Sequence, residues 1–451
     1  MSNERLIIGS DLAAPFAWRG GTAISRLQFI ADTTALAERL PAAGTMLNLS
    51  TDRYRFAVGL AAALLRGQSS LLPPNHLADT VGRLRARFTN AFALVEADGD
   101  DHGLPAISHA EVPASCAGVG RVPTIAAELV AAYVLTSGST GDPVPHAKPW
   151  GLLVVNARAE AARLASFLDR SDLTGIALVA TVPPQHMYGF ESSVLLAMLG
   201  GAAFDTGRPF FPADIAGTLS RLPAPRMLVT TPFHLKALLD AALPMPPLAL
   251  VVCATAPLSP QLAARAESQL GAPLVEIYGC TEAGQVATRR TTAGPEWRTF
   301  DGLRVDGDGA EVIVSGGHVA RPTPLADVLD VTGEQTFRLL GRANDLVNVA
   351  GKRSSIGHLN FHLNSIEGVV DGTFWMPAQD DCGSVVRLVA FVVAPGVARE
   401  LIVTALRERI DAAFVPRRVV HVDALPREAT GKLTASALAA LAAKTLPPPA
   451  P

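Results

Sequence analysis

The sequence predicts an α/β protein with a large layered N-terminal domain of mostly parallel sheets and a small α+β C-terminal domain. Short β-branched runs alternate with Ala/Leu-rich helical segments over the first three hundred residues, which is typical of helices layered on parallel strands. Near residue 300 the pattern changes to Gly- and Asp-rich hairpin sequence, as in FDGLRVDGDG. A chain of 451 residues is also long enough for two domains or more.

The expected elements follow one another along the chain. Four runs predict strands of the large domain: Ile176–Val182, Met227–Thr230, Leu248–Cys253 and Leu274–Tyr278. Three segments predict helices between them: Asn156–Leu168, Pro232–Ala242 and Pro260–Leu270. The small domain is expected to contain a strand, a helix and a strand: Val385–Val393, Glu400–Phe414 and Val419–Val422. We place the N-terminal domain at residues 1–343, the C-terminal domain at 344–444 and a flexible tail at 445–451.

Composition and charge exclude several classes of function. Apolar residues make up 49% of the chain and charged residues 18%, which is typical of a well-packed enzyme. The formal charge of −3 gives no basic excess, so we expect no nucleic-acid partner. The four cysteines lie far apart without a CxxC pair, as in a reducing compartment. The longest apolar stretch, Val194–Phe204, is too short to cross a bilayer. Because the N-terminus also lacks the pattern of a secretion signal, we predict a cytoplasmic protein without membrane insertion.

A loop rich in glycines and hydroxyl groups follows a predicted strand. Glycines allow backbone N–H groups to converge on an anion, and Ser and Thr hydroxyls add donors. The loop lacks the GK[ST] sequence of a nucleotide P-loop, and an ordinary Ser/Gly surface turn is the alternative for an isolated match. The basic residue expected just after it is missing, since position 144 is Val and the first lysine is Lys148. The loop consists of Thr136, Ser137, Gly138, Ser139, Thr140 and Gly141.

Four further stretches carry polar residues at the expected ends of strands or at turns. Their order along the chain is as informative as their composition. They are Pro183–Gly189, Tyr278–Glu282, Asp327 with Arg342 fifteen residues later, and Leu425–Lys432.

Together the five stretches resemble the motifs of the adenylate-forming superfamily, which includes acyl- and aryl-CoA ligases, adenylation domains of peptide synthetases, and luciferase. The resemblance runs from about residue 130 to residue 435. It implies the adenylate-forming enzyme fold, a C-terminal lid domain that moves, and the use of ATP with Mg²⁺. The compact length is also similar to that of small ligases of aryl-polyene and xanthomonadin-type pigment pathways, which load aromatic acids onto carrier proteins.

The resemblance assigns nucleotide contacts. The loop at residues 136–141 would hold the β- and γ-phosphates of ATP, Thr281 would contact the α-phosphate, and Glu282 would hold Mg²⁺. Asp327 and Arg342 would bind the ribose, with Asp330 as a less suitable substitute for Asp327. Lys148 or His146 could reach the phosphates in place of the lysine missing at position 144. The segment expected to lie against adenine contains Ala254, Thr255 and Ala256, although a tight strand-to-helix turn would have a similar composition. Tyr278 and Gly279 are further residues expected to bind the nucleotide.

By the same resemblance, Lys432 is the principal catalytic residue. Its ammonium would reach both the carboxylate and the α-phosphate and stabilise the charge that develops as pyrophosphate leaves. We place Thr281, Glu282 and His186 beside it in the catalytic set. Two positions, Asn344 and Asp345, correspond to the hinge of the lid. Two others, Ala350 and Gly351, correspond to the hairpin beside the thiol tunnel.

The acyl pocket is expected between three of these stretches. In peptide-synthetase domains an aspartate in the segment that matches His186 onward holds the substrate ammonium, whereas here Glu191 is the nearest carboxylate. A plain acid is therefore favoured over an amino acid, and His186, Tyr188 and Phe233 suit a flat aromatic acid. Core packing is the alternative role for these rings. The pocket residues are His186, Tyr188, Gly189, Phe233, Ile277 and Gly279.

These assignments predict an AMP-forming acid–thiol ligase. A small carboxylic acid, aromatic as in a hydroxybenzoate, would form an acyl-AMP and then pass to the phosphopantetheine thiol of an acyl carrier protein or of CoA. The sequence does not choose between these two acceptors. The alternatives are a fatty acyl-CoA ligase and a non-catalytic relative that retains only nucleotide binding.

Overall fold

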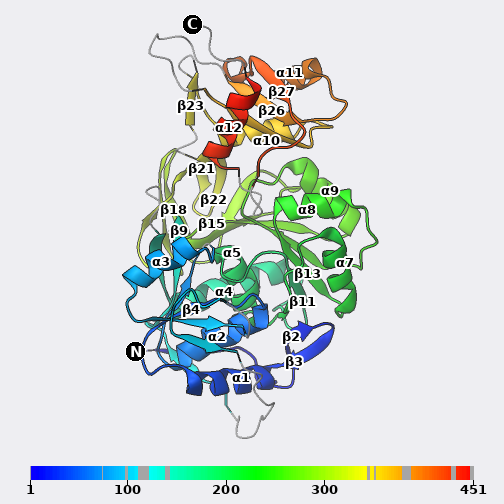
Figure 1. The fold of residues 1–451 in the computed structure, drawn as a ribbon. Helices are drawn as coiled ribbons and strands as arrows, with labels where there is room; N and C mark the ends of the chain where they lie inside the picture. Colours follow the sequence, from blue (N-terminus) through cyan, green and yellow to red (C-terminus); the bar gives the residue numbers. More distant parts are fainter. Residues whose placement is uncertain are drawn as a thin grey trace.

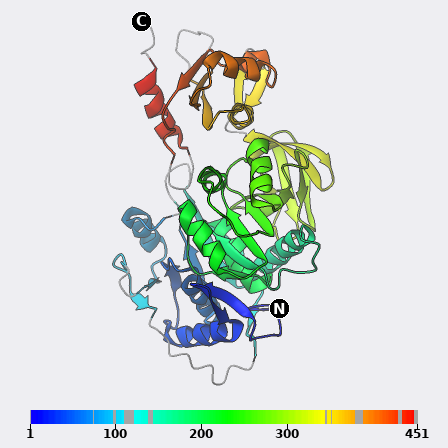
Figure 2. The ribbon, with the colours of Figure 1, turned by 90° about the vertical axis from the view of Figure 1, so that its right-hand side faces the viewer.

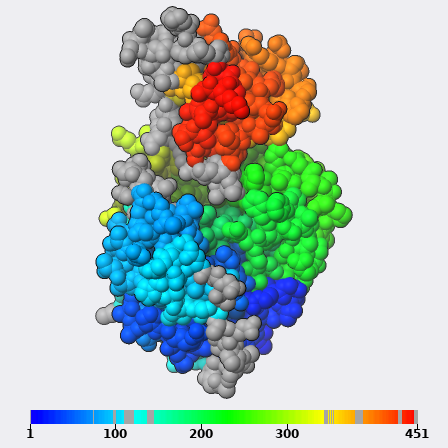
Figure 3. All heavy atoms as spheres, in the orientation of Figure 1, coloured from blue at the N-terminus to red at the C-terminus, as the bar shows by residue number. Residues whose placement is uncertain are grey.

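The structure is a computed structural model that describes residues 2–73, 75–96, 100–109, 121–137, 143–342, 346–349, 352–377, 388–427 and 433–446. A small domain, with α12 in red, lies at one end of a larger one in both ribbon views and on the surface (Figures 1, 2 and 3). The predicted α/β class is confirmed, and the sheets are mixed, with long parallel parts.

Within the described residues, the largest sheet has eleven strands in the order β21-β22-β17-β16-β15-β14-β13-β11-β12-β2-β3. The strands from β15 to β2 in this order are parallel, and both ends of the sheet are antiparallel. The bounds are β2 Pro15–Arg19, β3 Thr22–Ser25, β11 Ala177–Ala180, β12 Ala203–Asp205, β13 Arg226–Thr230, β14 Leu250–Cys253, β15 Leu274–Cys280, β16 Gly284–Arg289, β17 Glu296–Thr299, β21 Asp327–Gly333 and β22 Thr336–Arg342.

A second sheet packs against the N-terminal helices, with strand order β10-β9-β5-β4-β6-β7. Only the β9–β10 pair in it is antiparallel. Its strands are β4 Thr45–Asn48, β5 Ser70–Leu72, β6 Ala91–Val95, β7 Ala106–Ser108, β9 Val130–Ser137 and β10 Pro143–Pro149. Smaller sheets pair β1 (Asn3–Arg5) with β8 (Thr124–Ala126), and β18 (Leu303–Asp308) with β19 (Glu311–Gly316) and β20 (Thr323–Pro324).

Both faces of the parallel part of the large sheet are buried, which explains the continuous apolar runs in its strands. On β11, Leu178 and Ala180 join the core shared with the N-terminal helices, whereas Ala177 and Val179 face the core under α7, α8 and α9. The helices of the large domain are α1 Arg26–Arg39, α2 Arg53–Leu65, α3 Ala78–Arg87, α4 Trp150–Ser166, α5 Met187–Gly189, η1 Phe190–Leu195, α6 Leu196–Leu199, α7 Pro212–Arg221, α8 Pro232–Asp240 and α9 Pro260–Leu270.

The small domain is built on a three-stranded sheet covered on both faces. Along β26, Ala390 and Val392 pack toward α10 and α11, whereas Val389 and Phe391 pack toward α12. Its elements are β23 Leu346–Val349, β24 Lys352–Ser355, α10 Ile356–Asn364, β25 Asp371–Trp375, β26 Val389–Val393, α11 Arg399–Arg407, η3 Ala412–Phe414, β27 Arg418–His421 and α12 Ala435–Thr445.

Three of the four predicted helices differ from the structure at their boundaries, and α8 ends at Asp240, two residues before the predicted Ala242. Helix α4 begins at Trp150, six residues before the expected start, because Pro149 precedes it in extended conformation and its first turns are buried. The helix expected at Glu400–Phe414 ends at Arg407, and a separate 3₁₀ turn follows in which Asp411 caps the N–H of Ala413. In contrast, α9 has the bounds that were predicted.

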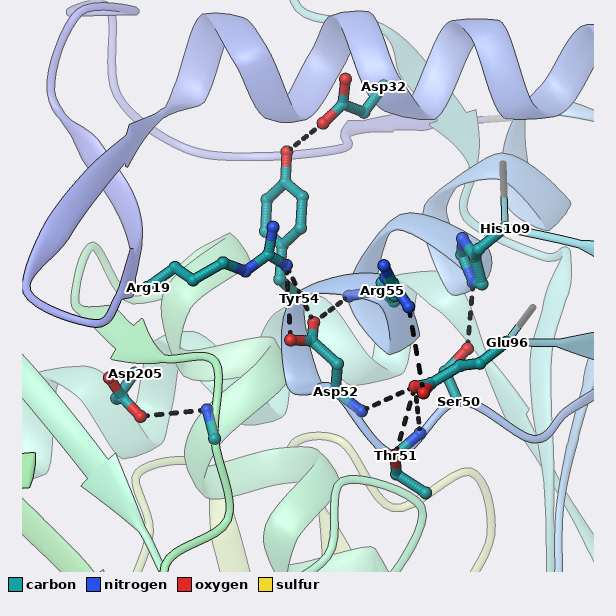
Figure 4. A network of polar contacts seen from close by, with 11 residues as sticks. Arg19, Asp32, Ser50, Thr51, Asp52, Tyr54, Arg55, Glu96, His109 and Asp205 are labelled. Atoms are coloured by element: carbon teal, nitrogen blue, oxygen red, sulfur yellow. Dashed lines mark hydrogen bonds and ion pairs between the residues drawn. The ribbon is translucent and has the colours of Figure 1, made fainter. Parts of the chain in front are cut away.

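A polar network fixes the start of α2 (Figure 4). Asp52 caps the helix by accepting from the N–H of Arg55, and it also accepts from Arg19 at 3.2 Å. Glu96 accepts from the N–H groups of Thr51 and Asp52 at 3.0 and 3.1 Å. The network sets the direction in which the next residue, Arg53, enters the core.

No helix in the described part of the chain is long and apolar enough to cross a bilayer.

Candidate functional site

Four predicted site segments begin where neighbouring parallel strands end. Strands β11, β13, β14 and β15 are adjacent and parallel, and the segments that contain His186, Phe233, Thr255 and Thr281 follow them in the chain. Because the carboxyl ends of parallel strands lie on one edge of a sheet, these segments share that edge, where α/β proteins usually bind ligands. The fold therefore brings together stretches that lie far apart in the sequence.

The turn after β14, expected to lie against adenine, has an unusual backbone. Thr255 has a φ of 80°, which is a sterically costly conformation for a β-branched residue. Its neighbour Ala254 is buried, whereas Thr255 and Ala256 are exposed. Such conformations cost about 1–3 kcal/mol and cluster at ligand sites. The geometry favours a binding turn over an ordinary connection.

Asp327, the predicted ribose contact, is the first residue of β21. The Tyr278 hydroxyl donates to its Oδ2 at 2.6 Å, and the Tyr278 ring packs against Trp297 and Phe337 with centroids 5.7 Å apart in each case. Arg342 is the residue opposite Asp327 in the β21–β22 ladder. The structure thus brings these three predicted residues together at the end of the sheet.

The alternative ribose ligand has other partners. Asp330 lies opposite Arg338 in the ladder, and their charged groups are 4.0 Å apart. Asp330 therefore forms an ion pair with Arg338 on the neighbouring strand, three residues along β21 from Asp327. This placement favours Asp327 of the two.

Thr281 and Glu282 form the turn between β15 and β16. The Glu282 side chain is 49% exposed, and its Oε1 lies 3.9 Å from His146 Nε2. Lys148 approaches the same turn from β10, and its ammonium donates to the carbonyl oxygens of Thr281 at 2.5 Å and Glu282 at 3.3 Å. Burial lowers the pKa of Lys148, while Glu191 and Glu282 oppose that shift. Lys148, predicted as a phosphate contact, is thus bonded to the backbone beside the turn.

The predicted pocket segment is shaped by close backbone contacts. A Cβ on Gly189 would lie 2.0 Å from the carbonyl oxygen of Pro183, so only glycine fits there. The Tyr188 hydroxyl donates to the carbonyl of Val252 at 3.0 Å, and burial raises the pKa of Tyr188 well above its usual range. This hydroxyl is therefore already committed to the protein backbone rather than to a ligand.

The other pocket residues differ in exposure. Phe233 is 41% exposed near the start of α8, with the rings of His234 and Phe210 at 5.3 and 6.5 Å. Ile277 is buried, whereas Gly279 is exposed beside a bulge in β15. His186 is half-buried at the N-terminus of α5.

The buried side chain of Arg53 holds the pocket segment, and this residue was not predicted from the sequence as part of the site. Arg53 donates to Ser193 Oγ at 2.6 Å and to the carbonyls of Ala180 and Val182 at 3.0 and 2.9 Å. It is fully buried, and burial lowers its pKa to about 10. Since Ala180 and Val182 lead into the segment of His186, Arg53 joins α2 to the edge where the site lies.

A group of buried polar side chains lies behind the pocket segment. Of this group, only Glu191 was named from the sequence. Asn156 donates to Glu191, which is 3% exposed, so this carboxyl lies in the interior and burial raises its pKa. Within the described residues, neither oxygen of Glu160 has a hydrogen-bond partner of good geometry, although Ser192 and Gln285 lie beside it. Burial raises the pKa of Glu160 to about 7.

A cavity of about 40 Å³ lies between these groups and the turn. That volume has room for a few water molecules. Lys148, Asn156, Glu191 and His318 line it, and Gly284, with a φ of 82°, leaves open the space in front of Glu191. A signal for this group was present in the sequence, since Asn156 and Glu160 are one turn apart on a helix whose other buried positions are apolar.

Several predicted residues lie outside the described residues. The strands on either side of two of these gaps are nevertheless paired: Ser137 lies opposite Pro143, and Val349 lies opposite Lys352. Arg427 forms an isolated bridge with Leu433. The side chains of Thr136, Ser137 and Arg342 are likewise not described. The predicted residues outside the described ranges are Gly138, Ser139, Thr140, Gly141, Asn344, Asp345, Ala350, Gly351 and Lys432.

Comparison with known proteins identifies the family. The pattern of the AMP-binding enzymes matches residues 57–336, and that of the AMP-binding enzyme C-terminal domain matches residues 377–432. This chain belongs to the AMP-binding enzyme family. The predicted superfamily is thereby confirmed, as is the predicted class of enzyme, an AMP-forming acid–thiol ligase.

Curated relatives and solved structures agree with this family. A 4-coumarate–CoA ligase of Rhodobacter capsulatus is 32% identical over 312 residues, which are 68% of this chain and 75% of that protein. A 4-coumarate–CoA ligase of Halorhodospira halophila is 32% identical over 317 residues, which are 66% of this chain and 73% of that protein. ATP-bound MatB from Rhodopseudomonas palustris has a TM-score of 0.79 at 17% identity, covering 96% of this chain and 97% of that one. The o-succinylbenzoate CoA synthetase of Bacillus subtilis has a TM-score of 0.76 at 16% sequence identity, and the match covers 96% of this chain and 97% of that one. At these identities the structures show a shared fold.

Proposed function

We propose that this enzyme activates an aromatic carboxylic acid, such as a hydroxybenzoate, as an acyl-AMP and transfers the acyl group to the thiol of CoA. One carboxylate oxygen attacks the α-phosphorus of ATP, and the bond to pyrophosphate breaks. The thiol then displaces AMP from the acyl carbon. Much of the rate would come from holding the two reactants in line.

The arrangement of Tyr278, Asp327 and the Thr281–Glu282 turn carries this proposal. Tyr278 of β15 donates to Asp327 at 2.6 Å, and the turn follows directly after the same strand. In this assignment Asp327 binds the ribose hydroxyls and Thr281 contacts the α-phosphate. Lys432 of the small domain, proposed as residues 344–444, supplies the positive charge in the adenylation step.

The residues of the turn fit a magnesium ion. The half-exposed Glu282 side chain offers carboxylate oxygens, the donors that Mg²⁺ prefers. Mg²⁺ is commonly held by one or two carboxylates together with substrate phosphates, so one glutamate beside the nucleotide is sufficient. When bound, the ion would neutralise charge on the phosphates.

Two observations favour an aromatic acid. The first two relatives named above are 4-coumarate–CoA ligases, and Phe233 presents a partly exposed ring near the expected pocket. Because the Tyr188 hydroxyl already donates to Val252, another polar group would have to recognise a ring hydroxyl. CoA is favoured over a carrier protein because these relatives act on CoA by name.

A pyrophosphate-release assay tests the proposal. Purified protein, ATP and Mg²⁺ would be incubated with hydroxybenzoates, cinnamates and fatty acids, and the products with CoA or a phosphopantetheinylated carrier protein would be identified by mass spectrometry. We expect acid-dependent pyrophosphate release to be strongest with aromatic acids, together with an aroyl-CoA product. Preferred turnover of fatty acids would overturn the aromatic assignment. Folded protein that binds ATP but releases no pyrophosphate with any acid would contradict catalysis.

A further inference from the structure

A buried lysine lies behind the turn that carries Thr281 and Glu282. Lys148 is 8% exposed, and its ammonium donates to both carbonyl oxygens of the turn, at 2.5 and 3.3 Å. These are consecutive peptide groups, so a single side chain fixes the path of the backbone through the turn. Charge-assisted hydrogen bonds of this kind are about twice as strong as neutral ones.

The surroundings of this lysine compensate for its burial. Removing an ammonium from water costs several kcal/mol unless other groups replace the lost solvation. Here the two carbonyls accept its protons, and the buried carboxyl of Glu191 faces its charge. Asn156 in turn donates to Glu191. Several buried polar groups thus surround Lys148. A lysine exposed to water would not need them.

The register of β10 shows which end of the hairpin this lysine serves. Residues 144, 146 and 148 share one face of the strand, since strand side chains alternate. Val144 lies opposite Thr136, next to the loop at residues 138–142, whereas Lys148 lies opposite Ala132. Positions 144 and 148 are therefore about 13 Å apart along the strand. Lys148 faces the turn between β15 and β16, at the far end of the hairpin from the loop.

We propose that Lys148 is a positioning residue that holds the Thr281–Glu282 turn in the geometry that receives the phosphates of ATP. It acts through the backbone of the turn rather than on the phosphates, so Lys148 does not replace the lysine absent at position 144 as a direct contact. This inference rests on the proposed function, because it gives the turn its role in nucleotide binding.

The inference predicts which substitutions preserve function. Lys148→Met retains the length of the side chain but leaves both carbonyls without their donor, and we expect the ATP dissociation constant to rise about tenfold. We expect kcat to fall further, by about 10²-fold, because small misplacements at a reacting centre are costly. Lys148→Arg retains the charge and donors and should recover most of both losses. Lys236→Met, at a partly exposed residue that pairs with Asp240, is the matched control and should change neither quantity.

A second variant separates positioning from direct contact. In Lys148→Met/Val144→Lys, a lysine stands beside the loop while the turn still lacks its donor. If Lys148 acts through the turn, this double variant remains as impaired as Lys148→Met. Hydrogen exchange should also show faster exchange at residues 277–289 in Lys148→Met. Recovery of ATP binding by Val144→Lys, or unchanged ATP binding and turnover in Lys148→Met, would overturn the proposal.

The measurements remain decisive if a variant folds poorly or if the proposed reaction is wrong. Should Lys148→Met fail to fold, Lys148→Gln, whose amide retains donors, replaces it and is expected to show the same losses at smaller size. ATP binding is measured by calorimetry without any acid, so it tests Lys148 even if no acid is activated. Wild-type protein that binds ATP but activates no acid would contradict the proposed function. Equal ATP binding by wild type and the Lys148 variants would contradict only the positioning role.

Discussion

The ribose side and the phosphate side of the proposed nucleotide site are held in place by different means. On the ribose side, Tyr278 and Asp327 belong to strands of the large sheet, and backbone ladders set their distance. On the phosphate side, Thr281 and Glu282 lie in a turn between two strands, and the side chain of Lys148 holds that turn.

This difference indicates what a substitution can disturb on each side. Strand register is maintained by many backbone hydrogen bonds, so a substitution at Asp327 removes a ligand contact and little else. The turn depends on one ammonium and its buried surroundings, so substitutions there alter the geometry of several groups together. We therefore expect losses of affinity on the ribose side and losses of turnover on the phosphate side.

The largest effect is expected from a substitution in the small domain, at Lys432, which belongs to neither the ribose side nor the phosphate side. Lys432→Met should lower acid-dependent pyrophosphate release by about 10²–10³-fold, the usual cost of removing one group that stabilises developing charge. ATP binding should change far less, because the sheet and the turn are intact. Pyrophosphate release and calorimetry with ATP measure the two quantities.

The control for this variant is Lys444→Met, which removes an exposed lysine of α12 in the same domain. Thioester formation from a synthetic acyl-adenylate and CoA should survive in Lys432→Met, since that half-reaction needs no charge stabilisation on pyrophosphate. Normal pyrophosphate release by Lys432→Met would show that the large domain suffices for adenylation, and the assignment of Lys432 would be wrong.

The fold could be predicted from sequence because its signals are local and repeated. Helix α9 begins with Pro260 and ends before Gly271, which adopts a left-handed conformation at its C-terminus, and these signals are readable in the sequence. The apolar runs of β11 and β13 indicate strands buried on both faces. The order of the motifs then identified the superfamily, which the family comparison confirmed.

The interior of the site could not be predicted in the same way. Arg53, Glu160 and Glu191 are charged residue types that are rarely fully buried, and only tertiary contacts show that they lie in the core. The φ of 80° at Thr255 is likewise invisible in the sequence. Lys148 was noticed, but its distance from the loop along β10 emerges only from the strand register.

A smaller effect is expected from Asp327→Asn on the ribose side. The change removes a charged acceptor, and hydrogen bonds to charged groups contribute about 1.5–3 kcal/mol. We expect the KM for ATP to rise by about tenfold to a hundredfold with kcat nearly unchanged. Asp330→Asn is the matched control on the same strand and should leave KM unchanged. If the two variants behave alike, or if kcat falls as much as KM rises, Asp327 does not act as a simple ribose contact.

The smallest effect is expected from Tyr278→Phe, which tests whether the ribose side contains a positioning residue of its own. The variant retains the ring that packs against Trp297 and Phe337 but removes the hydroxyl that donates to Asp327 at 2.6 Å. A hydrogen bond to a charged group contributes about 1.5–3 kcal/mol, but the hydroxyl acts on ATP only through Asp327. We therefore expect ATP affinity to weaken by a factor of only about two to ten, as measured by calorimetry. Combining it with Asp327→Asn should add less than the single changes predict, because the hydroxyl acts through the carboxylate that Asp327→Asn replaces. Full additivity would mean that Tyr278 acts independently of Asp327, and a fall in kcat as large as that of Lys148→Met would erase the contrast between the two sides.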